Sequence, residues 1–318
     1  MLQTFLSLLA GLFGLYVGAE GLVRGSASLA SQLGLSRLVI GLTVVAFGTS
    51  TPELVVSIKA AHDGLFAISL GNIVGSNICN IALILGLSAL IKPIRIHAQV
   101  VRLQIPIMIL ISLILMLLLL NGRLSRLEGA GLFLGIVFYT GYSLHLARKE
   151  NRRSNAKESG ESVKGPRASL WVSALFVAGG LGLLMAGAKF FLTGAVSLAR
   201  ILGVSEAFIG LTIVAIGTSL PELATSIMAV VKKEGDIAVG NVVGSNIFNI
   251  LCILGVSSLV QPIQMAGISL TDLGVMTATA ILVLPMARSG FLLARWEGAI
   301  LLAVYGAYIY YLSSLMAS

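Results

Sequence analysis

The 318 residues of this chain are 57% hydrophobic and only 11% charged, whereas an average soluble domain is about 25% charged. This composition excludes an ordinary soluble domain and predicts an integral membrane protein. The net charge of +8 does not indicate a nucleic-acid partner, because most basic residues lie in loops, where they set membrane topology. Both cysteines, Cys79 and Cys252, lie within apolar runs and predict buried thiols rather than a disulfide framework.

Ten apolar runs are long enough to cross the hydrocarbon core of a bilayer, which needs about 20 helical residues. They lie near residues 2–23, 37–61, 66–91, 99–120, 127–147, 170–190, 206–231, 236–260, 269–287 and 294–315. The first run lacks a basic start and a small-residue cleavage site, which favours a retained helix over a signal peptide. We therefore expect an all-α integral membrane protein with ten transmembrane helices.

The ten runs form two groups of five, separated by the only long polar segment. This segment, Arg148 to Arg167, carries seven basic and three acidic residues, and its Ser, Asn, Gly and Pro content is typical of a linker. The expected organisation is a first five-helix repeat over residues 1–147, a basic linker over 148–168 and a second repeat over 169–318.

The two halves resemble each other in sequence. Residues 41–94 recur as residues 210–263 at a constant offset of 169, with 31 identities in 54 positions and no gap. The identities concentrate in two motifs, GLTVVAFGTSTPEL against GLTIVAIGTSLPEL and GNIVGSNICNI against GNVVGSNIFNI. Because each half holds an odd number of spans, the second half enters the membrane from the opposite side, an inverted repeat typical of secondary transporters.

Charges in the loops predict the orientation in the membrane. If the N-terminus lies outside, 16 of the 21 Lys and Arg residues face the cytoplasm and 5 face outward. The positive-inside rule therefore predicts a multi-pass protein of the cell (inner) membrane with both termini outside and the central linker in the cytoplasm.

Glu53 and Glu222 occupy equivalent positions near the middle of the second and seventh spans. An ionised carboxylate there costs about 2.5–3.5 kcal/mol on insertion scales, so two of them predict a function. The structural alternative is a helix–helix hydrogen bond or an internal ion pair. It is weaker because no Lys or Arg lies at comparable depth, apart from Lys189 near a span end.

The residues around each Glu predict a broken helix. In both motifs a Pro follows a Gly by four residues, and the Pro ring removes a backbone donor and clashes with the carbonyl of that Gly. The break would free carbonyls around Ala46–Gly48 and Ala215–Gly217. Irregular backbone at this depth is tolerated only where protein or a water-filled cavity satisfies it. Neighbouring hydroxyls add further oxygens, from Thr49, Ser50, Thr218 and Ser219.

The second motif adds two polar side chains per half on one helix face. Ser76 and Asn80 are four residues apart, as are Ser245 and Asn249. The motif glycines allow close packing of helices. The amides of the neighbouring Asn77 and Asn246 suit packing or ligation, and we favour packing.

Together the motifs offer carboxylates, hydroxyls, amides and carbonyls, without a convincing imidazole or thiolate. This all-oxygen environment suits a hard cation such as Ca²⁺. One calcium ion, two or three monovalent ions or two protons would each neutralise the carboxylate pair. Mutually exclusive occupancy of one such pair is the physical basis of antiport.

The paired motifs GTS-x-PE and GN-x-x-GSN-x-x-N resemble those of the cation/calcium antiporter superfamily, and most of all its prokaryotic sodium/calcium exchanger branch. The resemblance covers nearly the whole chain. It implies ten helices, with the second, third, seventh and eighth spans around the ion sites and the first and sixth sliding to alternate access. It also implies a transporter and not an enzyme, with calcium and sodium as cargo, no cofactor and no obligate protein partner beyond the lipid bilayer.

Position by position, the resemblance makes Glu53 and Glu222 the central calcium ligands, joined by the backbone carbonyls of Thr49 and Thr218. It implies that flanking sodium sites are bounded by Ala46, Ser50, Ser76, Ala215, Ser219 and Ser245. It also places Asn80 and Asn249 between the two acids.

One position departs from part of the family. Some relatives, including potassium-dependent exchangers, carry Asp at the position of Asn249. The Asn here argues against potassium dependence, and sodium stoichiometry does not transfer simply from the Asp-containing relatives.

Sodium/calcium exchange is the leading hypothesis. A calcium/proton antiporter is the alternative, since the same desolvated carboxyls would carry two protons. The four serine hydroxyls favour sodium. An intramembrane hydrolase with the two carboxylates as acid and base does not explain the inverted symmetry. A channel is disfavoured because dehydrated, strongly charged sites bind ions too tightly for fast conduction.

Overall fold

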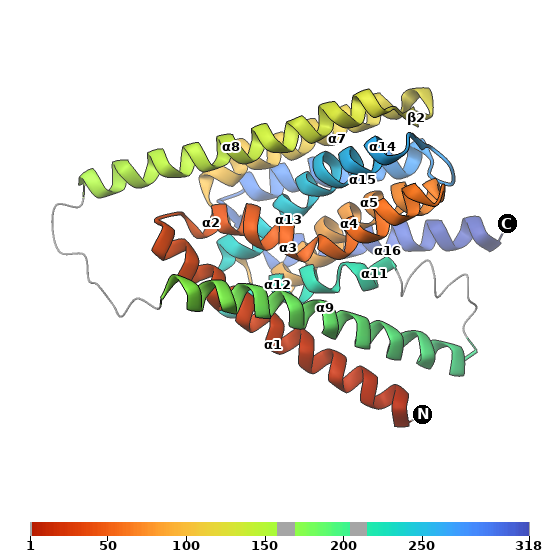
Figure 1. The fold of residues 1–318 in the computed structure, drawn as a ribbon, viewed down its shortest axis with the longest axis horizontal. Coiled ribbons are helices and arrows are strands. Elements are labelled where there is room, and N and C mark those ends of the chain that lie inside the picture. Colours follow the sequence, from red (N-terminus) through yellow and green to blue (C-terminus); the bar gives the residue numbers. More distant parts are fainter. Residues whose placement is uncertain (1, 158–168, 204–214, 318) are drawn as a thin grey trace.

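The computed structural model describes residues 2–157, 169–203 and 215–317, and most of them are helical (Figure 1). The first half contains α1 (Leu2–Leu33), α2 (Arg37–Ile40), η1 (Gly41–Val45), α3 (Ala46–Thr49), α4 (Thr51–His62), α5 (Phe66–Ile78), η2 (Cys79–Leu85), α6 (Gly86–Ile91), β1 (Ile94–Arg95), η3 (Val100–Gln104), α7 (Ile105–Leu118), η4 (Leu119–Asn121), β2 (Arg123–Leu124) and α8 (Arg126–Lys157). The second half contains α9 (Leu170–Ile201), α11 (Ala215–Thr218), α12 (Leu220–Val231), α13 (Gly235–Phe248), η6 (Asn249–Leu254), α14 (Gly255–Val260), β3 (Ile263–Gln264), α15 (Leu270–Arg288), β4 (Leu292–Leu293) and α16 (Arg295–Ala317).

Several of these helices suit a membrane. Among the described residues, seven helical segments are long and apolar enough to cross one, and an eighth is added if the bent pair Arg37–Thr49 and Thr51–His62 is one span. The predicted span 206–231 lies partly outside the described residues and ends in α12, a shorter apolar helix. The tenth predicted span coincides with α16. The all-helical membrane class predicted from the sequence is therefore confirmed.

The two helices that carry the second motif lie at the centre. Every residue of α13 from Ile237 to Phe248 is buried, including the polar Asn241, Ser245 and Asn246. Both central helices continue into π-helical turns, η2 after α5 and η6 after α13. Such turns occur frequently at functional sites, and here they hold Asn80 and Asn249.

Four two-residue strands join the halves. β1 pairs antiparallel with β4, with Ile94 opposite Leu293. β2 pairs with β3 in the same way, with Leu124 opposite Ile263. Adding 169 to Ile94 gives Ile263, and subtracting it from Leu293 gives Leu124, so the two pairings are equivalent contacts between the halves.

Helices α1 and α9 pack along each other and lie together at one edge of the molecule (Figure 1). Their glycines allow close backbone approach. A Cβ on Gly18 would lie 2.6 Å from the Leu184 nitrogen, and one on Gly187 would lie 2.6 Å from the Leu15 nitrogen. These two contacts are also related by the 169-residue offset, so α1 and α9 pack symmetrically.

Three helices are longer than predicted. α1 and α9 extend to Leu33 and Ile201, and polar contacts link the later part of α1 to the start of α9. Gln32 Nε2 lies 2.7 Å from Ser173 Oγ, which donates to Ser28 Oγ at 2.8 Å. α8 continues through Lys157 into the segment predicted as a linker, where Arg, Lys, Glu and Ala favour helix. The rest of that segment, residues 158–168, lies outside the described residues.

Candidate functional site

Both predicted helix breaks are confirmed, and each places a Glu in the first turn of a new helix. α3 ends at Thr49 and α4 begins at Thr51, with a 47° bend between the two helical segments. α12 likewise begins at Leu220, directly after Ser219. In both cases Pro occupies the first helical turn, where its missing N–H costs nothing.

The two glutamates exchange hydrogen bonds with the opposite half. Ser219 Oγ donates to Glu53 Oε1 at 3.1 Å, and Ser50 Oγ donates to Glu222 Oε1 at 2.8 Å. Glu53 is 1% exposed and Glu222 is 0% exposed. Each acid therefore approaches the helix break that carries the other acid, so the two halves form one buried site.

These contacts differ from those that the local sequence favours. Ser50 and Glu53, like Ser219 and Glu222, have the S-x-x-E spacing of a capping box, in which Ser and Glu cap their own helix. Neither Ser makes such a side-chain cap. Their hydroxyls are directed across the site instead.

Several buried side-chain oxygens of the two motifs have no hydrogen-bond partner among the described residues. They include Glu53 Oε2, Glu222 Oε2, Asn80 Oδ1 and Asn249 Oδ1. A buried polar atom without a partner costs about 1–3 kcal/mol. Because two of these atoms belong to carboxylates and two to amides, they are suitable ligands for a hard cation.

The site glutamates lack a basic partner in the described part of the chain. The ion pairs found among the described residues involve Glu20 and Glu234 and neither site glutamate. In the same part of the chain no group of three or more His, Cys, Asp and Glu side chains comes together. The side chains that bond the two carboxylates are the hydroxyls of Ser50 and Ser219.

The remaining predicted ligands lie around this pair. Ser219 Oγ is 3.3 Å from Ser76 Oγ, and Ser245 Oγ donates to the Ala46 carbonyl at 3.5 Å. The Ala46 carbonyl also accepts from Ser50 N at 3.0 Å, so it is not as free as predicted. Ala215 begins α11.

The two threonines face a pair of amides that the sequence interpretation missed. Thr49 Oγ1 donates to Asn241 Oδ1 at 3.0 Å, and Thr218 Oγ1 lies 3.4 Å from Asn72 Oδ1. Asn72 Nδ2 in turn donates to the Glu53 carbonyl at 3.3 Å and to Ser57 Oγ at 2.9 Å.

Asn241 makes the equivalent bonds in the other half. Its Nδ2 donates to the Glu222 carbonyl at 3.3 Å and to Ser226 Oγ at 3.0 Å. Asn72 and Asn241 therefore each bond the helix turn that carries the Glu of their own half. Each also contacts the Thr at the helix break of the other half. The signal was present, because Asn72 and Asn241 lie four residues before Ser76 and Ser245 on the same helix face.

The packing role favoured for Asn77 and Asn246 agrees with their contacts in part. Asn77 Nδ2 donates to the Asn246 carbonyl at 3.4 Å, and Asn246 Nδ2 donates to the Val242 carbonyl at 2.8 Å. Asn77 Oδ1 also accepts from Asn249 Nδ2 at 3.0 Å. This bond occupies the Nδ2 of Asn249, while the Oδ1 of Asn249 has no partner among the described residues.

Comparison with known proteins identifies the family. The sodium/calcium exchanger protein family matches residues 3–145 and 172–314. The chain belongs to this family. The two matched segments are themselves displaced by 169 residues, the offset that relates the site contacts.

Two relatives match this chain along almost their whole length. The putative antiporter CaxA of Alkalimonas amylolytica is 39% identical over 318 residues, which covers 99% of this chain and 100% of the relative. The sodium/calcium exchanger MaX1 of Methanosarcina acetivorans is 34% identical, covering 96% and 97% of the two chains.

The fold also matches a solved exchanger. The sodium-calcium exchanger NCX_Mj, soaked with sodium and no calcium, superimposes with a TM-score of 0.84 at 32% identity and covers 97% of this chain and 98% of that one. This chain is therefore an integral membrane member of the cation/calcium antiporter superfamily, in its prokaryotic sodium/calcium exchanger branch.

Proposed function

We propose that this protein exchanges calcium for sodium across the membrane, using one buried site that opens alternately to either side. The observation that carries the proposal is the reciprocal pair of buried acids. Each has one oxygen held by a serine of the other half and one oxygen without a partner in the described chain. One calcium ion neutralises both acids, and sodium ions at the flanking serines neutralise them in its place.

The proposed ligands are those that the sequence and the family resemblance single out. Glu53 and Glu222 bind calcium together with the carbonyls of Thr49 and Thr218. The flanking positions Ala46, Ser50, Ser76, Ala215, Ser219 and Ser245 bound the sodium sites. Asn80 and Asn249 supply amide oxygens between the acids, consistent with their buried and unpartnered Oδ1 atoms.

The proposed architecture is ten transmembrane helices in two inverted five-helix repeats, residues 1–147 and 169–318, joined by the linker 148–168. Support comes from the contacts between the halves that recur at an offset of 169: the Ser–Glu bonds, the Thr–Asn contacts and the strand pairs. Equivalent contacts between halves are expected when a symmetric repeat surrounds a central site.

The proposed orientation places both termini outside the inner membrane and the linker in the cytoplasm. The start of α1 and the end of α16 point towards one end of the molecule, and the end of α8 and the start of α9 lie towards the other (Figure 1). The excess of basic residues in the loops assigned to the cytoplasm supports this direction.

A calcium/proton antiporter is the second candidate, and one observation favours it. The two buried acids have no Lys or Arg ion-pair partner among the described residues. Protons would therefore neutralise them as completely as sodium. The four buried serines, which offer oxygens for sodium but are not needed for protons, favour the first candidate.

The test is uptake of radioactive calcium into proteoliposomes at clamped voltage. Vesicles are loaded with sodium or with acidic buffer, and a Glu53→Gln variant serves as the transport-dead control. Uptake driven by an outward sodium gradient at constant pH would support the sodium/calcium exchanger. Uptake that needs a proton gradient and ignores sodium would assign the protein to the calcium/proton class.

A further inference from the structure

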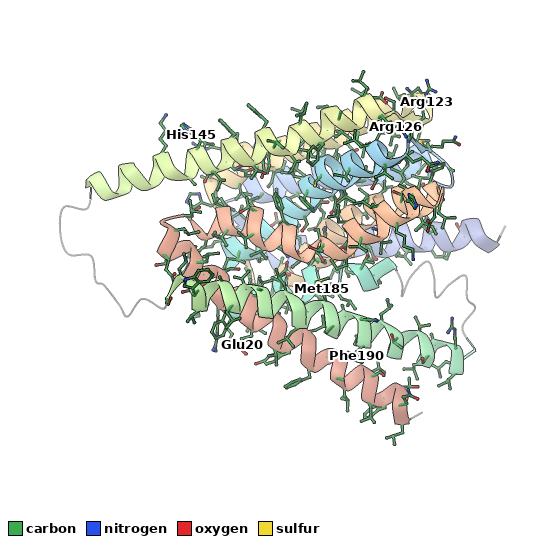
Figure 2. The ribbon with its side chains drawn as sticks, in the orientation of Figure 1. Glu20, Arg123, Arg126, His145, Met185 and Phe190 are labelled. Carbon is green, nitrogen blue, oxygen red and sulfur yellow. The ribbon has the colours of Figure 1, made fainter. Side chains whose placement is uncertain are left out.

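Two charged residues on the symmetric helix pair take no part in the ion site. Glu20 lies on α1, as Figure 2 shows, and Lys189 lies on α9. They are 169 residues apart and therefore occupy equivalent positions with opposite charge. Because a charged side chain in an apolar helix is expensive, each requires an explanation.

Glu20 has a partner on the helix that carries Glu222. Lys232 Nζ lies 2.7 Å from Glu20 Oε1, and Arg24 makes a second ion pair with the same oxygen at 2.6 Å. Lys232 is the C-cap residue of α12, where a positive charge is favourable. The pair therefore connects α1 to the end of α12.

The equivalent pair in the other half has its charges exchanged. Subtracting 169 from Lys232 gives Asp63, which is the C-cap residue of α4. The counterpart of the Glu20–Lys232 pair is thus the Lys189–Asp63 pair. In the first pair α1 supplies the acid and the end of α12 supplies the base. In the second pair α9 supplies the base and the end of α4 supplies the acid. An acid at a helix C-terminus is unfavourable alone, so Asp63 gains from a nearby cation.

The Lys189–Asp63 pair is not formed in this conformation. Within the described part of the chain, neither residue takes part in an ion pair, and both are exposed. α1 packs against α12, whereas the equivalent helices α9 and α4 scarcely touch.

This asymmetry does not lie within the α1–α9 pair. Gly25 approaches the Val177 nitrogen and Gly194 approaches the Leu8 nitrogen, with Cβ distances of 2.9 and 3.0 Å, and these contacts are again equivalent. The α1–α9 pair is symmetric in itself, but it contacts the two equivalent helices α12 and α4 unequally. It therefore has a second, equivalent position. In that position α9 meets α4 as α1 now meets α12.

We propose that Lys189 and Asp63 form an ion pair in this second position and act as positioning residues of the transport cycle. The proposal rests on the alternating-access function above. In the proposed topology the Glu20–Lys232 pair closes the cytoplasmic side of the present conformation. The Lys189–Asp63 pair closes the outer side of the opposite conformation.

Cross-linking tests the proposal directly. In a full chain with both native cysteines replaced by alanine and a specific protease site placed within residues 158–168, one variant carries Asp63→Cys and Lys189→Cys. The matched control carries Glu20→Cys and Lys232→Cys. A short bis-maleimide is added in membranes with sodium, calcium or neither present. After cleavage of the linker, cross-linked halves migrate together on a denaturing gel.

We expect both pairs to cross-link, with the yield for positions 63 and 189 rising under the ions that lower the yield for positions 20 and 232. Cross-linking of the control pair without any link between 63 and 189 would overturn the proposal. Failure of both pairs would contradict the Glu20–Lys232 contact on which it depends. Since the readout is a link and not a flux, it is independent of which ion is the counter-ion.

A charge exchange supplies the second measurement, with the native cysteines in place. Lys189→Asp and Asp63→Lys each put like charges together in the opposite conformation and should slow exchange about two- to fivefold. The two changes combined should restore the rate to within about twofold. If the double variant is as slow as the slower single variant, the two residues do not pair and the proposal is wrong. Lys189 would then only extend towards lipid headgroups, and Asp63 would only be solvated.

Discussion

Ser50 and Glu222, 172 residues apart, are joined by a 2.8 Å hydrogen bond in which the serine hydroxyl donates to the carboxylate. The equivalent bond from Ser219 to Glu53 measures 3.1 Å. Each half thus positions the acid of the other half. Loss of one serine should therefore disturb the opposite acid rather than the acid on its own helix.

The first prediction concerns the acids. Glu53→Gln or Glu222→Gln should abolish calcium transport, because the amide nearly preserves shape but removes the charge that attracts the cation. Transport in proteoliposomes and thermal melting in detergent check this outcome, and melting should remain cooperative. Glu297→Gln is the matched control, since Glu297 is also buried but accepts from Ala294 N at a helix start. Normal flux from either site variant would refute the ligand assignment.

The second prediction concerns the serine donors. Ser219→Ala should weaken apparent calcium affinity about tenfold or more, because a hydrogen bond to a charged group contributes about 1.5–3 kcal/mol. The concentration dependence of calcium uptake measures the effect. Ser112→Ala removes a buried hydroxyl that, among the described residues, donates to the Met108 carbonyl of its own helix, and it should leave the affinity unchanged. Equal effects of the two variants would mean that Ser219 acts through stability alone.

The third prediction concerns Asn241, which bonds the carbonyl of Glu222 and the hydroxyls of Ser226 and Thr49. Asn241→Ala should lower the melting temperature and the calcium affinity, since lost buried bonds cost about 1–3 kcal/mol. Asn241→Asp keeps an acceptor for Thr49 but loses both donated bonds. We expect it to resemble the Ala variant in melting. Native melting of Asn241→Asp would show that the donated bonds contribute little.

The fourth prediction concerns Asn249. Asn249→Asp adds a third carboxylate to the site and removes the donor to Asn77 Oδ1, now 3.0 Å away. The added charge should change the dependence of exchange on the monovalent ion, either in apparent affinity or in the number of ions per calcium. Sodium titrations and reversal-potential measurements read these two quantities. If both are unchanged, Asn249 serves only to pack the central helices.

The fifth prediction concerns the close contact of α1 and α9. Gly187→Ala should lower the melting temperature, because its Cβ would lie 2.6 Å from the Leu15 nitrogen and force the backbones apart at a cost of about 1–3 kcal/mol. Gly182→Ala, on the same helix but with no atom within 4 Å of its Cβ, is the control. An equal drop in both variants would point to a general loss of helix flexibility instead.

Much of this molecule follows from local sequence. The breaks before Glu53 and Glu222 were predictable because a Pro four residues after a Gly disrupts the backbone whatever surrounds it. The apolar membrane helices were predictable for a similar reason, since hydropathy and length alone specify a span. The duplication added the equivalence of the two acids, because identical motifs at a constant offset occupy equivalent places.

Contacts between the halves required the folded chain. The spacing of Ser50 and Glu53 favours a capping box within one helix, yet Ser50 bonds Glu222 because the other half brings a buried carboxylate within reach. The contact of Asn72 with Thr218 likewise crosses between the halves, so only the folded chain shows it.

The pairing of Glu20 with Lys232, while Lys189 and Asp63 stay apart, is likewise invisible in the sequence. The two pairs occupy equivalent positions in the sequence, and only the packing of α1 against α12 shows which of them is formed. Local steric and hydropathic rules act on neighbours in the chain. A site shared by two halves depends on distances between residues about 170 positions apart, which packing alone sets.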